Sequence, residues 1–383
     1  MNEHRVLFVG LGDLGSQIFD LLVRLPTRIS FLVGGRNLEY LKQRTNLSLF
    51  AATQLGLNPD VSCTYIDLWN REQTAETISR FQPSIIFCAA TLQRTEAMHN
   101  LSTSIAEQLA EAQLGPRLLL HLALVYRLMQ SLQMTGLKAT VLNAVNPDVV
   151  GPILHQVGLA PTTGIGDLAN NVPALRMSIA AHLDRPVEQI DIRLVMARYV
   201  SYRMSRFLIE DEPFSLTTLI NGEELLHPLQ LKPVLDLLLT RFKRMGGITG
   251  LVMTAASASL IFNDIVNNTG LTTHAPGPNG LPGGYPVKVN SKGVEIVLPS
   301  HLSLEVAIET NRRGLYLDGI EKIDSDGTVY FVEKNMSIFK RLFGYECKRM
   351  PLMEAADWAE ELQARYAAFA DKGVDSAGWS PPP

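Results

Sequence analysis

The sequence has few cysteines and no long hydrophobic run. Its 383 residues contain three cysteines, Cys63, Cys88 and Cys347, and none belongs to a C-x-x-C pair. An odd and scattered set favours neither a disulfide framework nor a zinc site. The longest apolar stretches, 118–129 and 250–262, are too short to span a bilayer. We therefore expect no metal site and no membrane-spanning segment.

The chain also lacks an excess of charge of one sign. It has 34 Lys and Arg against 38 Asp and Glu, a formal net charge of −4, and 46% hydrophobic residues. This balance argues against nucleic acid or an anionic membrane as a partner. An apolar strand begins by residue 5, so we expect no signal peptide and a cytoplasmic location. The length fits two domains.

The clearest motif is glycine-rich and lies near the start. An apolar strand at 5–9 runs into Gly10-Leu11-Gly12-Asp13-Leu14-Gly15, and a helix is predicted over 16–23. In such a motif the first glycine permits a tight turn, the second lets the backbone approach a pyrophosphate, and the third lets helix and strand pack closely. The strand before and the helix after the glycines are the context that the motif requires.

The end of the second strand, at 29–33, indicates which dinucleotide binds. It is followed by Gly34-Gly35-Arg36-Asn37, where an NAD site usually carries Asp or Glu to accept the ribose hydroxyls. The guanidinium of Arg36 cannot accept those bonds, but its fork suits a 2′-phosphate. We therefore expect NADP(H), with NAD(H) less favoured. The alternative is that Arg36 is a solvated surface residue and that NAD binds in another way.

Three further strands are predicted at 61–66, 84–90 and 139–143, alternating with helices. This order is typical of a doubly wound parallel sheet, and we assign residues 1–150 to a Rossmann dinucleotide-binding domain. Asp67, after the third strand, lies near the adenine in such folds or caps a helix. The fourth strand ends in residues small enough for a dinucleotide to pass over them: Ala89, Ala90 and Thr91.

Residues 151–371 change in character, and we expect an α+β substrate and oligomerisation domain there. Helices are predicted at 172–183, 223–245 (broken early by Pro228 and Pro233), 248–267, 302–311 and 354–370. Strands are predicted at 189–196, 286–289 and 294–298, with a hairpin formed by 315–323 and 328–332. The segment 272–280 is too rich in glycine and proline to be regular, and the tail 372–383 is expected to be disordered.

The fifth strand leads into Asn143-Ala144-Val145-Asn146-Pro147-Asp148, which resembles the Asn-Pro segment of the lactate/malate dehydrogenase family. Gly164-Ile165-Gly166-Asp167, before a helix carrying Arg176, resembles the Gly-rich strand before that family's helix with the catalytic aspartate. The segments 247–259 and 285–298 resemble its long helix beside the substrate and its late pair of strands. The resemblance is weak in identity but spans most of the chain, and it implies that family's architecture and a homodimer.

The resemblance also implies roles for two residues. Asn146 would lie beside the nicotinamide and hydrogen-bond the reacting oxygen of the substrate; alternatively, Asn146-Pro147 merely ends a strand. Arg94 lies in the segment 92–96 after the fourth strand, where the family carries an arginine that closes over the substrate and polarises its carbonyl. The alternative for Arg94 is a solvated loop arginine.

The family's catalytic pair does not carry over. The position of the family's histidine corresponds to the stretch 196–201, but this chain has no histidine between His182 and His227. The partner aspartate falls at Asn171, and the substrate-carboxylate arginine falls near Ala174. Ordinary 2-hydroxy-acid chemistry is therefore doubtful.

Three other residues are candidate proton donors: Tyr199, Tyr202 and His274. Either tyrosine could act as the proton donor if Arg198 or Arg203 lowers its pKa. The alternative is that both are residues of a strand whose side chains alternate between a packed and an open face. His274 follows the helix that should line the site; otherwise it is an exposed loop residue. Asn170 and Asn171 either bind a polar substrate or cap the helix that follows.

These observations predict an NADP(H)-dependent oxidoreductase. It would transfer hydride between nicotinamide C4 and a carbonyl or imine carbon of a small polar metabolite. Possible partners for an anionic substrate are Arg94, Arg176, Arg198 and Arg203. Two alternatives stay open: a protein that senses NADP(H) without catalysis, and an enzyme that holds its dinucleotide permanently as a redox shuttle.

Overall fold

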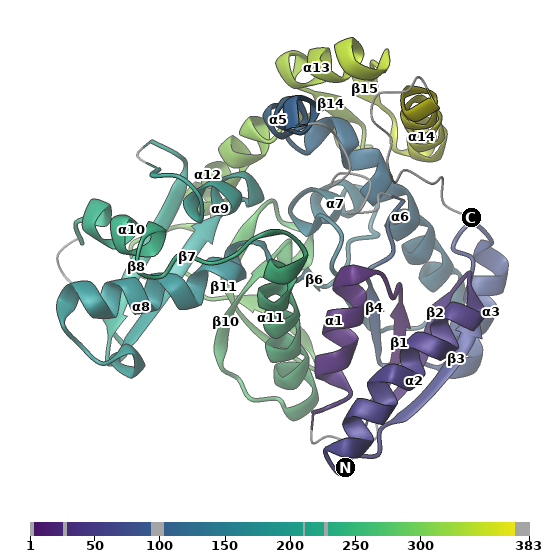
Figure 1. Ribbon diagram of the computed structural model, residues 1–383, viewed down its shortest axis with the longest axis horizontal. Coiled ribbons are helices and arrows are strands. Elements are labelled where there is room, and N and C mark those ends of the chain that lie inside the picture. The colour runs from purple at the N-terminus through teal and green to yellow at the C-terminus, as the bar shows by residue number, and fades with distance from the viewer. Residues whose placement is uncertain (1–3, 26–28, 93–102, 210, 226–228, 372–383) are drawn as a thin grey trace.

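A six-stranded parallel sheet organises the first half of the chain (Figure 1). The computed structural model describes residues 4–25, 29–92, 103–209, 211–225 and 229–371. The strand order is β3-β2-β1-β4-β5-β6. Strands β1 to β3 are therefore added toward one edge of the sheet, and β4 to β6 are added toward the other. The strands are β1 (His4–Val9), β2 (Ile29–Gly35), β3 (Asp60–Tyr65), β4 (Ile85–Cys88), β5 (Thr140–Asn143) and β6 (Thr163–Gly164).

Both faces of this sheet are buried, as a parallel sheet requires. Successive side chains of β1 point to opposite faces, so Val6 and Phe8 join one hydrophobic cluster and Leu7 and Val9 join another. The first cluster includes the apolar face of α1, and Phe8 stacks on Phe87 of β4 with ring centroids 4.6 Å apart. The sheet is therefore the middle layer of three.

The helices of this half alternate with its strands, as the sequence predicts. They are α1 (Asp13–Leu22), α2 (Leu38–Gln54), α3 (Arg71–Phe81), α5 (Thr103–Ala112), α6 (Leu118–Thr135) and α7 (Pro147–His155). Helix α6 is apolar over most of its surface because it lies between the sheet and the C-terminal elements. It ends at Gly136, whose positive φ of 68° is suited to glycine.

The second half is built on an antiparallel sheet with the order β10-β11-β7-β8-β9, and β12 pairs with β11. Its strands are β7 (Ile190–Met196), β8 (Phe214–Ile220), β9 (Glu223–Glu224), β10 (Thr272–Pro276), β11 (Gly284–Asn290) and β12 (Gly293–Ile296). Its helices are α8 (Val172–Leu183), α9 (Arg198–Met204), α10 (Leu231–Leu239), α11 (Gly247–Asn267) and α12 (Leu304–Leu317), and the 3-10 helix η2 (Asp167–Asn171) precedes α8.

The C-terminal elements return to the first half. A small sheet, with the order β13-β14-β15, is flanked by α13 and α14 (top of Figure 1). These elements are β13 (Ile320–Ile323), β14 (Val329–Phe331), α13 (Glu333–Phe343), β15 (Arg349–Met350) and α14 (Ala355–Asp371). Their buried residues share one hydrophobic cluster with α6 and with β1. The hydrophobic cores therefore do not follow the division at residue 150, and β6 extends the first sheet to residue 164.

The parallel-sheet half and most later elements confirm the sequence predictions, but three predictions are wrong. Residues 272–276 form strand β10 and not an irregular loop, because they pair with β11 in register from Thr272 with Lys288 to Pro276 with Gly284. The long helix expected over 223–245 is reduced to α10. The run after β7 coils into α9. The predicted disordered tail, 372–383, lies outside the described residues.

Helix α11 is the one helix of the described chain that is long and apolar enough to cross a membrane by length and composition alone. The sequence expectation placed its apolar stretch at 250–262, but the helix runs over 21 residues. It packs against α1 and β11, and Ala255, Ala258 and Phe262 lie in the same cluster as β1. Only 33% of its most apolar window is buried against these elements, so much of its apolar surface is exposed.

Candidate active site

The glycine loop has the geometry that its sequence predicts. Gly10 adopts a φ of 100°, and a Cβ atom at this position would lie 2.7 Å from the backbone nitrogen of Ala90. A Cβ atom at Gly15 would lie 2.0 Å from the carbonyl oxygen of Gly10, so the loop closes tightly on α1. A Cβ atom at Gly12 would meet nothing within 4 Å. The space that a pyrophosphate needs is therefore open at Gly12 and closed at the other two glycines.

A cavity of about 520 Å³ lies over this loop at the carboxyl edge of β1, β2 and β4. Ten of the predicted cofactor residues line it: Gly10, Gly12, Asp13, Gly35, Arg36, Asn37, Asp67, Ala89, Ala90 and Thr91. The predicted residues Leu14, Gly15 and Asn146 are not in the lining. Tyr40, Trp69 and Leu124 also line the cavity and were not expected from the sequence. The residues present thus fit a dinucleotide.

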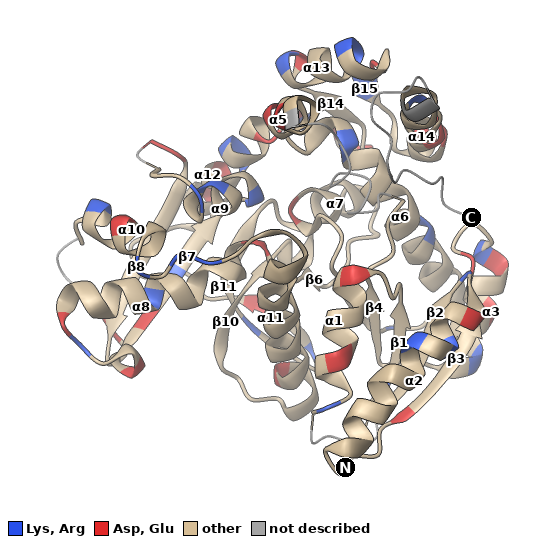
Figure 2. Cartoon of the chain, in the orientation of Figure 1, with Lys and Arg blue, Asp and Glu red and all other residues tan. Residues whose placement is uncertain are grey.

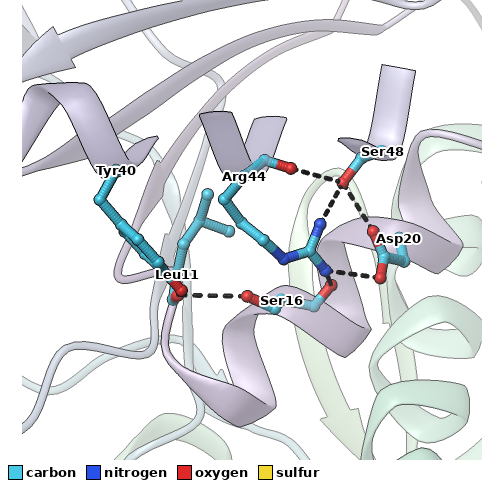
Figure 3. Close-up of polar contacts among 6 residues, drawn as sticks. All are labelled: Leu11, Ser16, Asp20, Tyr40, Arg44 and Ser48. Atoms are coloured by element: carbon cyan, nitrogen blue, oxygen red, sulfur yellow. Dashed lines mark hydrogen bonds and ion pairs between the residues drawn. The ribbon is translucent and has the colours of Figure 1, made fainter. Parts of the chain in front are cut away.

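A polar network fixes helix α2 against the glycine loop (Figure 3). The hydroxyls of Ser16 and Tyr40 both donate to the carbonyl oxygen of Leu11, each at 3.1 Å. Deeper in the network, Arg44 pairs with Asp20 at 2.6 Å, and Ser48 donates to the same carboxylate. Because α1 and α2 are held together in this way, the cavity wall that carries Arg36 keeps its position relative to the glycines.

The polar residues after β2 and β3 differ in whether their side chains bind the backbone or face the cavity. Arg36 is exposed at the cavity. Asn37 caps α2, and its side chain accepts from the backbone N–H of Tyr40 at 3.0 Å. Asp67 accepts from the backbone N–H of Trp69 at 3.1 Å, whereas the cap of α3 is Asn70. The alternative role of Asp67 as a helix cap is therefore wrong, and its carboxylate stays at the cavity.

The next carboxyl ends, those of β5 and β6, present Asn146 and Asp167. Both residues adopt a left-handed backbone, with φ values of 42° and 47°. The buried side chain of Asn143 holds the turn before Asn146 through bonds of 2.9 Å to the backbone N–H and carbonyl of Val145. Among the described residues, Oδ1 of Asn146 and Oδ2 of Asp167 are buried and have no hydrogen-bond partner. Strained backbone and unpartnered buried oxygens at a sheet edge point to a site for a ligand.

A cluster of charged residues surrounds this edge. Arg198, the first residue of α9, donates from Nε to the carboxylate of Asp318 at 2.7 Å and forms a second bond to it through Nη2. The backbone N–H of Arg198 donates to Asp148 at 2.5 Å. Asp148 is fully buried, and the negative charge of Asp167 acts on its carboxyl group. The cluster therefore joins α7, η2, α9 and α12.

The two carboxyls of Asp148 and Asp167 share an environment that favours a bound proton. Burial raises the pKa of both groups, and the negative charge of Asp167 raises the pKa of Asp148 further. Arg198 opposes these effects without cancelling them. Because both carboxyls are buried and repel each other when ionised, the pair favours one bound proton.

His121 of α6 connects this cluster to the cavity. Its Nδ1 lies 3.1 Å from the hydroxyl oxygen of Thr91, which lines the cavity. Burial, together with the positive charges of Arg117 and Arg198, lowers the pKa of His121 to about 3. The imidazole is therefore neutral at physiological pH and serves as a hydrogen-bonding group rather than as an acid.

The proton donors expected from the sequence are placed differently. His274 lies in β10, is buried, and accepts the backbone N–H of Leu194 at Nε2, at 3.1 Å. Burial lowers its pKa to about 3, so the prediction of a loop acid is wrong. Tyr199 and Tyr202 lie in helix α9, not in a strand, and the guanidinium carbon of Arg206 stands 3.9 Å from the ring centre of Tyr202. Arg94 lies outside the described residues.

Three arginines proposed as anion partners are already engaged. Arg176 donates to the carbonyl oxygen of Ile190 at 2.6 Å, Arg198 is bound to Asp318, and Arg203 pairs with Glu212 at 2.9 Å. The side chain of Asn170 donates to Thr254 at 2.8 Å. That of Asn171 donates to Ser201 at 2.9 Å, and neither asparagine side chain caps α8.

Sequence reasoning gave no role to Asp318 or His121, included Asp148 and Asp167 only as parts of longer segments, and took Arg198 as a possible anion partner or a neighbour of the tyrosines. The available signal was local: Asp148 and Asp167 each follow a strand of the parallel sheet, where carboxyl ends meet at one edge. Nothing local to Asp318 indicates its distant partner.

Comparison with known proteins identifies the fold. No protein-family model and no curated protein matches the sequence. Solved structures do match. A lactate dehydrogenase from Eimeria maxima, with NADH and oxamate, aligns with a TM-score of 0.56 and 12% identity over 82% of this chain and 92% of its own. A malate dehydrogenase from Plasmodium falciparum aligns with a TM-score of 0.54 and 16% identity over 82% of this chain and 99% of its own.

The malate dehydrogenase from Picrophilus torridus aligns with a TM-score of 0.54 and 14% identity, covering 83% of this chain and 98% of its own. The chain has the lactate and malate dehydrogenase fold. At these identities the likeness establishes the fold alone. Within that dehydrogenase fold, the charged cluster lies at the carboxyl edge of the parallel sheet, the edge at which α/β proteins bind their ligands.

The carboxyl pair predicts a dependence of stability on pH. A carboxyl group whose folded pKa exceeds its unfolded value of about 3.9 contributes stability at low pH and loses it as the pH rises toward the folded pKa. Asp148→Asn removes the second charge while its amide can still accept from Arg198 and donate to Asp167. The variant should therefore be more stable than the wild type at pH 8 by about 1–3 kcal/mol, since each pKa unit represents ~1.4 kcal/mol.

Thermal unfolding of both proteins between pH 4 and pH 8 measures this difference. The gain should shrink toward pH 4, where the folded carboxyls are protonated and the unfolded ones, with a pKa of about 3.9, are about half protonated. A difference that does not change with pH would contradict the shared proton.

Proposed function

We propose that the protein is an NADP(H)-dependent oxidoreductase that transfers hydride between nicotinamide C4 and a carbonyl or imine carbon of a small polar metabolite. The observation that carries the proposal is the arrangement of the carboxyl edge. The dinucleotide cavity ends at Thr91, and the next two strands along the sheet present Asn146 and the Asp148–Asp167 pair. The lactate dehydrogenase of Eimeria maxima, which has this fold, was solved with NADH and oxamate.

Each group at this edge has a task in the proposed reaction. The reduced dinucleotide supplies a hydride to the carbonyl carbon, and the π electrons of the C=O bond move to oxygen. The amide of Asn146 donates a hydrogen bond to that oxygen as negative charge develops on it. Asp167, partly exposed beside fully buried Asp148, gives the proton of the pair to the oxygen, and the pair regains a proton from solvent. For an imine, the proton precedes the hydride.

Asp167→Asn tests this assignment. The amide tolerates the left-handed backbone but cannot exchange a proton, so kcat should fall by about 10²–10⁴-fold while NADPH binding is unchanged. The control is Asp184→Asn, an exposed residue with a similar φ of 52°. Turnover is measured as NADPH oxidation across a panel of carbonyl and imine substrates, and binding as quenching of intrinsic fluorescence.

If the wild type binds NADPH tightly and oxidises it with no compound of the panel, the alternative of a sensor without catalysis is favoured. Equal turnover by both aspartate variants would exclude Asp167 as the proton donor. Cofactor that remains bound through purification would favour the redox-shuttle alternative.

We propose NADP(H) over NAD(H) because of Arg36. Its exposed side chain lines the cavity at the end of β2 and has no carboxylate partner among the described residues. Asn37, which could offer an oxygen to a ribose hydroxyl, uses its Oδ1 on the backbone of α2. The edge of β2 thus offers a cation and no free carboxylate.

Arg36→Asp should weaken NADPH binding by about 10–100-fold, which corresponds to the ~1.5–3 kcal/mol of a charge-assisted hydrogen bond. NADH binding should change much less. Lys42→Gln, at an exposed position of α2 that does not line the cavity, serves as the control. Titrations of both cofactors against all three proteins measure the preference. Equal losses for the two cofactors would defeat the assignment.

We further propose that the protein forms a homodimer through α2 and α11, which both pack on α1 (Figure 1). Their outer faces expose Leu47 and Phe50 on α2 and Val252 on α11, each by more than half of its surface. Paired with the same face of a second copy, these side chains would be removed from water.

Phe50→Glu should convert the dimer into a monomer, since the substitution places a charge in the apolar contact. Tyr316→Glu, on the exposed side of α12, should leave the dimer intact. Sedimentation velocity at micromolar concentration measures the mass of each protein. A monomeric wild type would refute the proposed contact.

A further inference from the structure

Two arginines of the second half lie near each other, and neither has an acidic partner within the described part of the chain. Arg206 follows α9, and Arg244 lies in the connection from α10 to α11; in Figure 2 the Lys and Arg positions of both segments are blue. A Cβ atom at Gly246, two residues from Arg244, would lie 3.1 Å from Nη2 of Arg206. The charge of Arg206 is one cause that lowers the pKa of Arg244, after burial.

Neither guanidinium pairs with a carboxylate of the described residues. No salt bridge of the described residues includes Arg206 or Arg244, although neighbouring Arg203 is paired with Glu212. Two neighbouring cations that repel each other, one of them half-buried, are destabilised unless an anion compensates them. An arrangement that keeps them together is therefore suited to a ligand that carries negative charge.

Both guanidiniums are nevertheless held in place. Arg206 lies against the ring of Tyr202, and its Nη1 donates to the carbonyl oxygen of that residue and to Ser205, each at 2.9 Å. Arg244 donates from Nη2 to Oδ1 of Asn171 at 3.1 Å. These bonds use one nitrogen of each guanidinium. The described structure records no protein acceptor for Nε and Nη2 of Arg206 or for Nε and Nη1 of Arg244, and these groups are free to bind a carboxylate or a phosphate.

The buried side chain of Asn171 relates this pair to the sheet edge. Asn171 ends η2, and Asp167 begins it. A 3-10 helix rises ~2.0 Å per residue, so the contact of Arg244 lies about 8 Å along η2 from Asp167. An anionic group bound there is several bonds away from a carbon that reacts beside Asp167 and Asn146.

We infer that Arg206 and Arg244 form an anion subsite for the substrate, which therefore carries a carboxylate or phosphate remote from its reacting carbon. The distance between this anionic group and the reacting carbon rests on the proposed function, whereas anion binding at the arginine pair does not. The subsite selects against metabolites whose only charged group adjoins the reacting carbon, because such a group cannot reach both guanidiniums.

The test measures binding, without turnover. NADPH-loaded protein is titrated calorimetrically with inorganic phosphate and, separately, with glutarate, at constant ionic strength set with chloride. Saturable binding is expected for at least one anion, and the affinity should fall about tenfold or more in Arg206→Gln and in Arg244→Gln, the loss expected for one charge-assisted bond. Arg241→Gln, an exposed arginine in the same connection that contacts Phe242, is the matched control and should bind as the wild type does.

The two anions distinguish a phosphate from a carboxylate substrate. Absence of saturable binding by both anions, or equal affinity in all three variants, would overturn the subsite. If a variant unfolds, labelling of the wild type with phenylglyoxal decides: phosphate or glutarate should protect Arg206 and Arg244 but not Arg241, and equal labelling would overturn the inference.

The outcomes separate the subsite from the proposed function. Anion binding that depends on both arginines, in a protein that never oxidises NADPH, would keep the subsite and refute the oxidoreductase. Turnover of uncharged ketones as fast as of their carboxylated analogues would refute the subsite and keep the oxidoreductase.

Discussion

Arg198 is the junction on which the site depends. Its backbone binds Asp148 of α7, and its guanidinium binds Asp318 at the end of α12. The same carboxylate of Asp318 accepts the backbone N–H of Leu114 at 3.3 Å, and its carbonyl oxygen accepts that of Gly115 at 2.8 Å. One arginine thus joins the parallel-sheet half, the antiparallel half and the C-terminal elements. A guanidinium in this position is stable only while anions compensate it, so removal of either partner would leave a buried charge.

The same charge balance places a proton at the sheet edge. Asp318 already satisfies the guanidinium of Arg198, so Asp148 and Asp167 receive less compensation than two ionised carboxylates require. Their burial makes it favourable for one of them to stay protonated. Burial keeps His121 neutral as well, and the positive charges of Arg117 and Arg198 add to that effect. The cluster is therefore a structural junction and, at the same time, a source of one exchangeable proton.

The sequence predicts the glycine loop and the parallel sheet because both depend on local signals: glycines at fixed offsets and apolar runs of strand length. It could not predict β10, since pairing with β11 and burial of Thr273 and Ala275 outweigh the content of proline. It could not predict the charged cluster either. Arg198 and Asp318 are 120 residues apart, and only the return of α12 to α9 brings them together. His274, a candidate acid chosen by its local context, is buried in strand β10, which pairs with β11.

The arginines show how structure changes the interpretation of a residue type. Four arginines seemed equally suited to an anion from sequence; three of them bind carbonyls or carboxylates of the protein, and Arg94 lies outside the described residues. The sequence does not single out Arg206 and Arg244, yet they lie near each other and pair with no carboxylate of the described residues. A cation acquires a role in binding through what the fold leaves uncompensated around it. In this dehydrogenase fold, the uncompensated charge lies along η2 from the carboxyl pair, so charge recognition and proton exchange are separated along one short helix.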